Sequence, residues 1–77
     1  MLKIKDNIDL KELEKFGFKS SEQLGFCKYN DNMTVTFGGL KKIIIECDDC
    51  YFDTDINECI EWLYDLIQAG LVEKVEE

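Results

Sequence analysis

The middle of the chain carries a clear β-hairpin pattern, and it limits the fold more than any other feature. Met33, Val35 and Phe37 alternate with two threonines, which is the two-residue period of a half-buried strand. Two glycines follow, a pair typical of a two-residue turn that needs positive φ at both positions. The segment 40–47 then predicts a second strand. Its continuous run Ile43–Ile45 predicts that this strand is covered on both faces.

A third strand extends this hairpin on its N-terminal side. Residues 30–32 are Asn-Asp-Asn, which tolerate positive φ and favour a turn. The segment 24–29 before them is also predicted as a strand. We therefore expect a three-stranded antiparallel meander over about 24–29, 33–37 and 40–47.

A short helix is predicted before the meander. Asp9 with Glu12 resembles a capping box, and Gly17 provides a left-handed stop. These signals predict a helix of about two turns over 10–16, which needs packing against the sheet to be stable. Its apolar face is expected to hold Leu10, Leu13 and Phe16.

A longer helix is predicted after the meander. Asp55 with Glu58 predicts its N-cap and Gly70 its end, so the helix is expected over 56–69. The expected apolar arc comprises Ile56, Cys59, Ile60, Leu63, Leu66 and Ile67. The opposite face comprises Glu58, Glu61 and Asp65, with Trp62 and Tyr64 at its two borders.

Together these patterns predict a single α+β domain over residues 1–77. It would contain a short N-terminal helix, a three-stranded antiparallel meander and a C-terminal helix packed on one sheet face. Residues 2–4 and 71–75 are candidates for a small additional pairing of the chain ends. A chain this short buries only roughly 60% of its unfolded surface, so we expect a marginal core.

Charge is divided unevenly along the chain. Residues 1–42 hold eight Lys and six acids, a net charge of +2, whereas residues 43–77 hold one Lys and eleven acids, a net charge of −10. The total of −8 works against direct binding to nucleic acid or to anionic membranes. One side of the molecule is therefore expected to attract basic protein surfaces.

The missing residue types narrow the function further. The chain has no Arg for bidentate phosphate clamping and no His to serve as a general base. No apolar run approaches the length of a membrane span, and the first residues lack the apolar stretch of a signal peptide. We expect a non-enzymatic cytoplasmic protein that needs no cofactor.

An acidic surface bordered by aromatic residues is the leading candidate for a functional site. Like charges at i,i+4 destabilise a helix by a few tenths of a kcal/mol, so a helix face without interleaved Lys suggests a role beyond stability. Trp and Tyr often anchor protein interfaces. The predicted partner-binding residues are Asp48, Asp49, Tyr51, Asp53, Asp55, Glu58, Glu61, Trp62 and Asp65. The alternative is an ordinary solvated surface that maintains solubility.

Metal binding is a second hypothesis. Cys47 and Cys50 form a C-x-x-C, and with Cys59 and Cys27 they could offer four thiolates to zinc. Structural zinc sites usually show two such pairs, and Cys59 also fits the apolar arc, so free thiols are favoured. The segment 53–57 matches the first ligand positions of a calcium loop, but its later positions do not match.

Two stretches of the chain resemble a known group of proteins. Met1 to Phe18 and Tyr64 to Val75 are similar to segments of small orphan proteins encoded by phages and mobile elements of low-GC Gram-positive bacteria. Some acidic members of that group inhibit host nucleic-acid enzymes, including anti-CRISPR proteins that imitate DNA. The resemblance implies an inhibitor that binds the basic surface of a nucleic-acid-binding protein in the host cytoplasm. A homodimer that covers Ile43–Ile45 by self-association is a further hypothesis.

Overall fold

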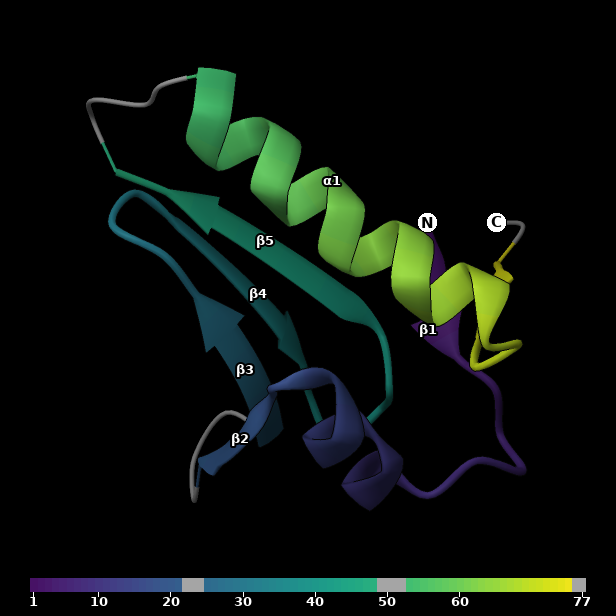
Figure 1. Ribbon diagram of the computed structural model, residues 1–77. Coiled ribbons are helices and arrows are strands. Elements are labelled where there is room, and N and C mark those ends of the chain that lie inside the picture. The colour runs from purple at the N-terminus through teal and green to yellow at the C-terminus, as the bar shows by residue number, and fades with distance from the viewer. Residues whose placement is uncertain (22–24, 49–52, 76–77) are drawn as a thin grey trace.

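The computed structural model describes residues 1–21, 25–48 and 53–75. Within these ranges the chain forms a four-stranded antiparallel sheet, a long helix across one sheet face, and a small second sheet at the chain ends (Figure 1). In chain order the elements are β1 (Leu2–Ile4), the 3-10 helix η1 (Leu10–Phe16), β2 (Lys19–Ser21), β3 (Gly25–Tyr29), β4 (Met33–Phe37), β5 (Ile43–Cys47), α1 (Asp53–Gln68) and β6 (Val72–Lys74).

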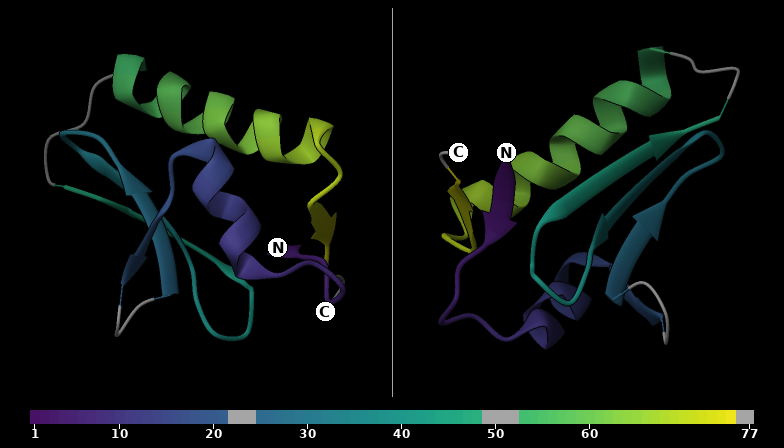
Figure 2. Two further views of the ribbon diagram at one scale, coloured as in Figure 1. Left: turned by 60° about the horizontal axis from the view of Figure 1, so that its bottom comes forward. Right: turned by 180° about the vertical axis from the view of Figure 1, so that it is seen from behind.

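The central strand of the core is β4. Its strand neighbours are β3 and β5, and Val35 lies opposite Lys28 on one side and Ile45 on the other. Met33, Val35 and Phe37 are buried, as their alternation predicts. They share the sheet face that α1 crosses (Figure 2).

The predicted number of strands is wrong. The sequence predicts a three-stranded meander, whereas the main sheet has a fourth strand, β2, alongside β3. The short β2 segment pairs through its backbone, with Lys19 opposite Cys27, and it has no apolar alternation to reveal it. A glycine is required where β3 begins, because a Cβ on Gly25 would lie 2.3 Å from the carbonyl oxygen of Phe37.

The predicted N-terminal helix is also wrong in type, because η1 is a 3-10 helix. Its N-cap is Asp9, whose carboxylate accepts the Lys11 N–H at 2.9 Å. The helix ends at Gly17, which has a φ of 87°. The apolar residues of this segment recur every third position, and this spacing matches a helix with three residues per turn. Leu13 is consequently fully buried.

The two chain ends pair as β1 and β6. Ile4 lies opposite Val72, and both side chains are buried in the same core that α1 covers. Beyond the strands, the Val75 N–H donates to the Met1 carbonyl at 2.7 Å. This two-stranded sheet brings the beginning and the end of the described chain together (Figure 1).

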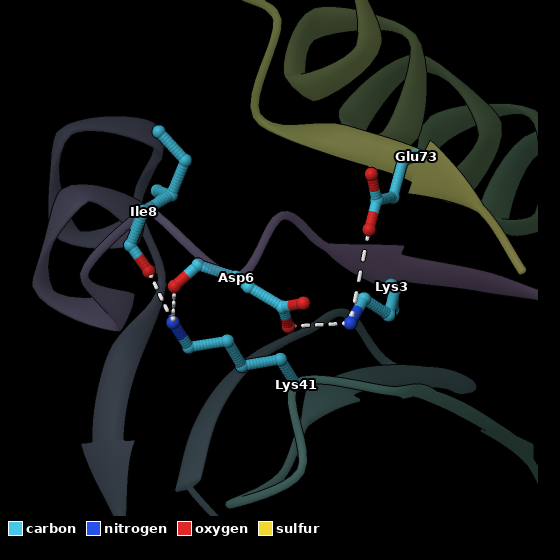
Figure 3. A network of polar contacts seen from close by, with 5 residues as sticks. All are labelled: Lys3, Asp6, Ile8, Lys41 and Glu73. Atoms are coloured by element: carbon cyan, nitrogen blue, oxygen red, sulfur yellow. Dashed lines mark hydrogen bonds and ion pairs between the residues drawn. The ribbon is translucent and has the colours of Figure 1, made fainter.

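The connection from β4 to β5 spans residues 38–42, unlike the predicted two-residue turn. Positive φ occurs at Lys41, at 65°, and at neither of the two preceding glycines. The Lys41 carbonyl accepts the Ile4 N–H at 2.8 Å, and its ammonium donates to the carbonyls of Asp6 and Ile8 (Figure 3). Contacts with a distant segment therefore determine this turn, and the local sequence does not reveal them.

The burial of α1 and β5 also differs from the prediction. The helix begins at Asp53, so Asp55 lies inside its first turn and is not its N-cap. Ile60 and Ile67 of the predicted arc are 56% and 47% exposed, because the helix is rotated to pack Trp62 against the core. Similarly, β5 is not covered on both faces, since Ile44 and Ile45 project from opposite faces and are 50% and 48% exposed.

Candidate protein-binding face

Three carboxylates follow one side of α1, and we call this set the acidic stripe: Glu58, Glu61 and Asp65. All three are exposed. Their spacing of three and four residues places them on one helix face, as the sequence predicts. With about 1.5 Å of rise per residue, the stripe extends roughly 10 Å along the helix axis.

The other predicted acidic residues do not join this stripe uniformly. Asp48 is exposed directly after β5, and Asp53 begins α1 on a different side of the helix. Asp55 is half-buried, and its carboxylate accepts a hydrogen bond from the Asn32 side chain. Asp49 and Tyr51 lie outside the described residues. The described part of the chain therefore supports a narrower acidic face than the sequence suggests.

The turn between β3 and β4 fixes the first turns of α1. The Asn30 amide donates at 3.1 Å to the Asp55 carbonyl and at 3.1 Å to the Glu58 carboxylate. Its oxygen accepts the backbone N–H groups of Asn32 and Met33, at 3.1 and 2.8 Å. The residues Asn-Asp-Asn predict a turn, but they do not predict that Asn30 also holds the start of α1, because its partners there are 25 and 28 residues away.

Trp62 lies beside the stripe and is held by a lysine. The Lys28 ammonium lies 4.8 Å from the centre of the Trp62 ring and donates at 2.8 Å to the Phe16 carbonyl. One cation thus links β3, η1 and α1. Trp62 is half-buried against the core, so it presents only part of its ring to a partner.

No ion pair among the described residues involves the acidic stripe. Among the described residues, lysines lie within 4 Å of carboxylates only in the pairs Lys3–Asp6, Lys3–Glu73 and Lys15–Glu12. The hydrogen bond from Lys3 lowers the pKa of Asp6. All of α1 lacks Lys and Arg, and the negative end of its dipole lies near Asp65. The side of α1 that carries the stripe therefore combines three carboxylates, none of which forms an ion pair with a lysine among the described residues.

The cysteines are not gathered into a metal site in the described part of the chain. Cys27 and Cys47 project from opposite faces of the sheet, since they lie opposite Thr36 and Met33 of β4. Cys59 is buried in the core, and burial raises the pKa of its thiol, which disfavours the thiolate that zinc requires. Cys50 lies outside the described residues. No three potential metal ligands cluster among the residues that the structure places.

The predicted calcium segment begins the α1 helix. Asp53 and Asp55 have helical backbone, and the Asp55 carboxylate is already bonded to Asn32. A calcium loop would instead turn its first ligands inward around the ion. Residues 53–57 therefore act as the start of a helix.

A second, apolar surface was missed by the sequence reasoning. On the other side of α1 lie three exposed apolar side chains, which we call the apolar flank: Ile60, Tyr64 and Ile67. The helical period places Ile60 and Ile67 at the edge of the expected core arc, and only the rotation of α1 exposes them. The signal in the sequence is that Tyr64, outside the expected arc, lies next to Ile60 at that edge.

Comparison with models of known families, with curated proteins and with solved structures gives no match to this chain. In the described residues, no helix combines the length and the apolar character needed to cross a membrane.

Proposed function

We propose that this chain is a non-enzymatic protein-binding module whose acidic stripe docks on the basic, nucleic-acid-binding surface of a host protein. It would act in the host cytoplasm as an inhibitor, in the manner that the resemblance to phage-encoded proteins implies. The carboxylates would take the places of phosphates. The observation that carries this proposal is that Glu58, Glu61 and Asp65 share one exposed helix face without a lysine partner among the described residues.

Two physical arguments support a role in binding. A helix selected for stability alone would mix positive and negative charges at i,i+4, whereas Glu61 and Asp65 repel each other at that spacing. The helix is also fixed firmly, through Asn30 at its start and Lys28 at Trp62. A charged surface on a rigid element loses little conformational entropy on binding, which favours affinity.

Displacement of proteins from DNA tests this proposal. A lysate of a low-GC Gram-positive bacterium is bound to DNA-cellulose, and the purified chain is added at low salt. We expect specific DNA-binding proteins to elute with the chain, and we expect elution to weaken steeply as salt rises. Glu61→Lys with Asp65→Lys should abolish elution. Glu58 is kept because it accepts a hydrogen bond from Asn30.

A charge-matched variant provides the control. Glu14→Lys with Asp31→Lys changes the net charge by the same amount, and both side chains are exposed and lie off the stripe. This control should elute the same proteins as the unmodified chain. Equal loss in both variants would show that net charge alone acts, and equal elution by both would show that the stripe is not the binding face.

A further inference from the structure

The outer edge of β5 carries free backbone groups. In the main sheet β5 is the last strand, so only one of its edges is paired with β4. Gly38 N–H donates to the Lys42 carbonyl, and Asp48 N–H donates to the Asn32 carbonyl at 2.9 Å. The backbone N–H and C=O groups of the even-numbered residues of β5 therefore point toward β4. In an antiparallel ladder the groups at odd positions then point outward.

In the half of β5 that lies away from β1, the outward N–H and C=O groups are those of Ile45 and Cys47. At the other end, the edge is closed by β1, through a single bridge between Lys3 and Lys42. Among the described residues no strand pairs with the outer edge beyond that bridge. An edge of this kind is a template for an added strand.

The apolar flank of α1 lies on the same side of the molecule as this edge. α1 packs over β4, the strand next to β5 (Figure 1). Trp62 faces inward to Lys28 of β3, and the flank lies on nearly the opposite side of the helix, away from β3. Its side chains are 47–59% exposed. The helix thus extends an apolar surface toward the open edge.

The two sides of the edge differ in chemistry. Ile45 shares the sheet face of the buried Val35, so its half-exposed side chain lies on the side of α1. Glu46 and Asp48 project to the opposite sheet face, are exposed, and have no lysine within 4 Å among the described residues. An added strand would therefore meet an apolar surface on one side and carboxylates on the other.

We propose that the outer edge of β5 binds an extended segment of a partner protein, in which apolar residues alternate with Lys or Arg, as an added antiparallel strand. Its backbone would exchange hydrogen bonds with Ile45 and Cys47. Its apolar side chains would pack under the apolar flank, and its basic side chains would lie across from Glu46 and Asp48. This site is separate from the acidic stripe and does not depend on the proposed function.

Charge argues against a second copy of this chain as the occupant. Antiparallel self-pairing that avoids β1 places Glu46 opposite Glu46 or Asp48 of the copy, and like charges opposite each other are destabilising. The register that would pair Lys42 with Asp48 of the copy runs through positions that β1 already bridges. A basic segment avoids the repulsion between like charges, and it can pair with Ile45 and Cys47 without using the positions that β1 bridges.

Synthetic peptides test the added strand. The probe is a fluorescent peptide in which four lysines alternate with three valines, and the control has the same composition with its valines and lysines in separate blocks. Fluorescence anisotropy should show at least tenfold tighter binding of the alternating peptide. Equal affinity of the two peptides would mean that charge alone binds them, which overturns the proposal.

Methylation of the peptide backbone tests the hydrogen bonds directly. In antiparallel pairing, the residues opposite Ile45 and Cys47 share their sheet face, so the valine amides face β5 and the lysine amides face solvent. N-methylation of the valines should abolish binding, and N-methylation of the lysines should change the affinity less than threefold. Any other pattern overturns antiparallel addition at this edge.

Charge reversal locates the site and separates it from the acidic stripe. Glu46→Lys with Asp48→Lys should weaken the alternating peptide at least tenfold. Glu61→Lys with Asp65→Lys makes the same change of net charge and should leave the affinity within threefold. If the second variant loses the peptide instead, the peptide binds at the stripe and the β5 proposal fails. A stable dimer of the unmodified chain that the peptide cannot dissociate would also overturn it.

Discussion

Lys28 is the cation that connects three elements of the fold, so its ammonium should contribute strongly to stability. We consider Lys28→Met, which keeps an apolar side chain of similar length and removes the charge. The change eliminates the hydrogen bond to the Phe16 carbonyl and the contact with the Trp62 ring. A hydrogen bond from a charged group contributes about 1.5–3 kcal/mol, and a cation–π contact about 0.5–2 kcal/mol.

The more apolar Met side chain offsets part of this loss, so we expect the free energy of unfolding to fall by about 2 kcal/mol. For a domain of this size that corresponds to a decrease in Tm of roughly 8–16 °C. Urea unfolding followed by Trp62 fluorescence measures the change. Lys19→Met is the matched control, because Lys19 is exposed on the neighbouring β2 strand, and it should change stability by less than about 0.5 kcal/mol.

A double-mutant cycle with Trp62→Leu isolates the contact between the ammonium and the ring. We expect a coupling energy of about 1 kcal/mol between Lys28→Met and Trp62→Leu, followed by circular dichroism because the fluorophore is removed. The reasoning is refuted if Lys28→Met is as stable as the unmodified chain. A coupling energy near zero would refute the ring contact alone.

Three further predictions follow from side-chain contacts. Asn32→Ala removes the donor to Asp55 and should speed amide hydrogen exchange over 53–58 while leaving 62–68 unchanged. Burial raises the pKa of Cys59 above 9.0, so its contribution to stability is present below that pH and is lost as pH rises further. The urea midpoint should therefore fall more from about pH 8.5 to about pH 10 than it does in Cys59→Ala. Because Lys3 lowers the pKa of Asp6 below 3.8, their contribution is present above that pH and is lost as pH falls. In Lys3→Met, an NMR titration should show the Asp6 pKa rising again.

The sequence predicts those parts of the fold in which apolar or charged side chains recur at the regular spacing of a strand or a helix. Val35 and its alternating neighbours predict β4, and the spacing of Glu58, Glu61 and Asp65 predicts their shared helix face. The β2 strand lacks such a pattern, since its backbone pairs with β3 and its side chains bury little. Similarly, the spacing of three in the segment 10–16 predicts a helix, and it fits the three residues per turn of η1 better than the 3.6 of an α-helix.

In the candidate site, too, the sequence predicts some features and misses others. Sequence predicts which carboxylates share a face, but it does not predict that Asp55 would be bonded to Asn32, or that Lys28 would cover Trp62. Both contacts join residues far apart in the chain. Asn32 already fits the sequence pattern of a turn and Lys28 that of a strand, so neither pattern points to the distant partner. The exposure of Ile60 and the open edge of β5 also depend on how distant segments pack, which the local sequence pattern does not show.

The central claim is that the acidic stripe of α1 presents a negative potential, since no lysine lies within 4 Å of its carboxylates among the described residues. Paramagnetic probes of equal size and opposite charge measure this potential near each amide by NMR relaxation. We predict that relaxation by the cationic probe exceeds that by the anionic probe most strongly along residues 58–65 of α1. A uniform ratio over the chain, or a maximum on another surface with no excess over 58–65, would contradict the claim.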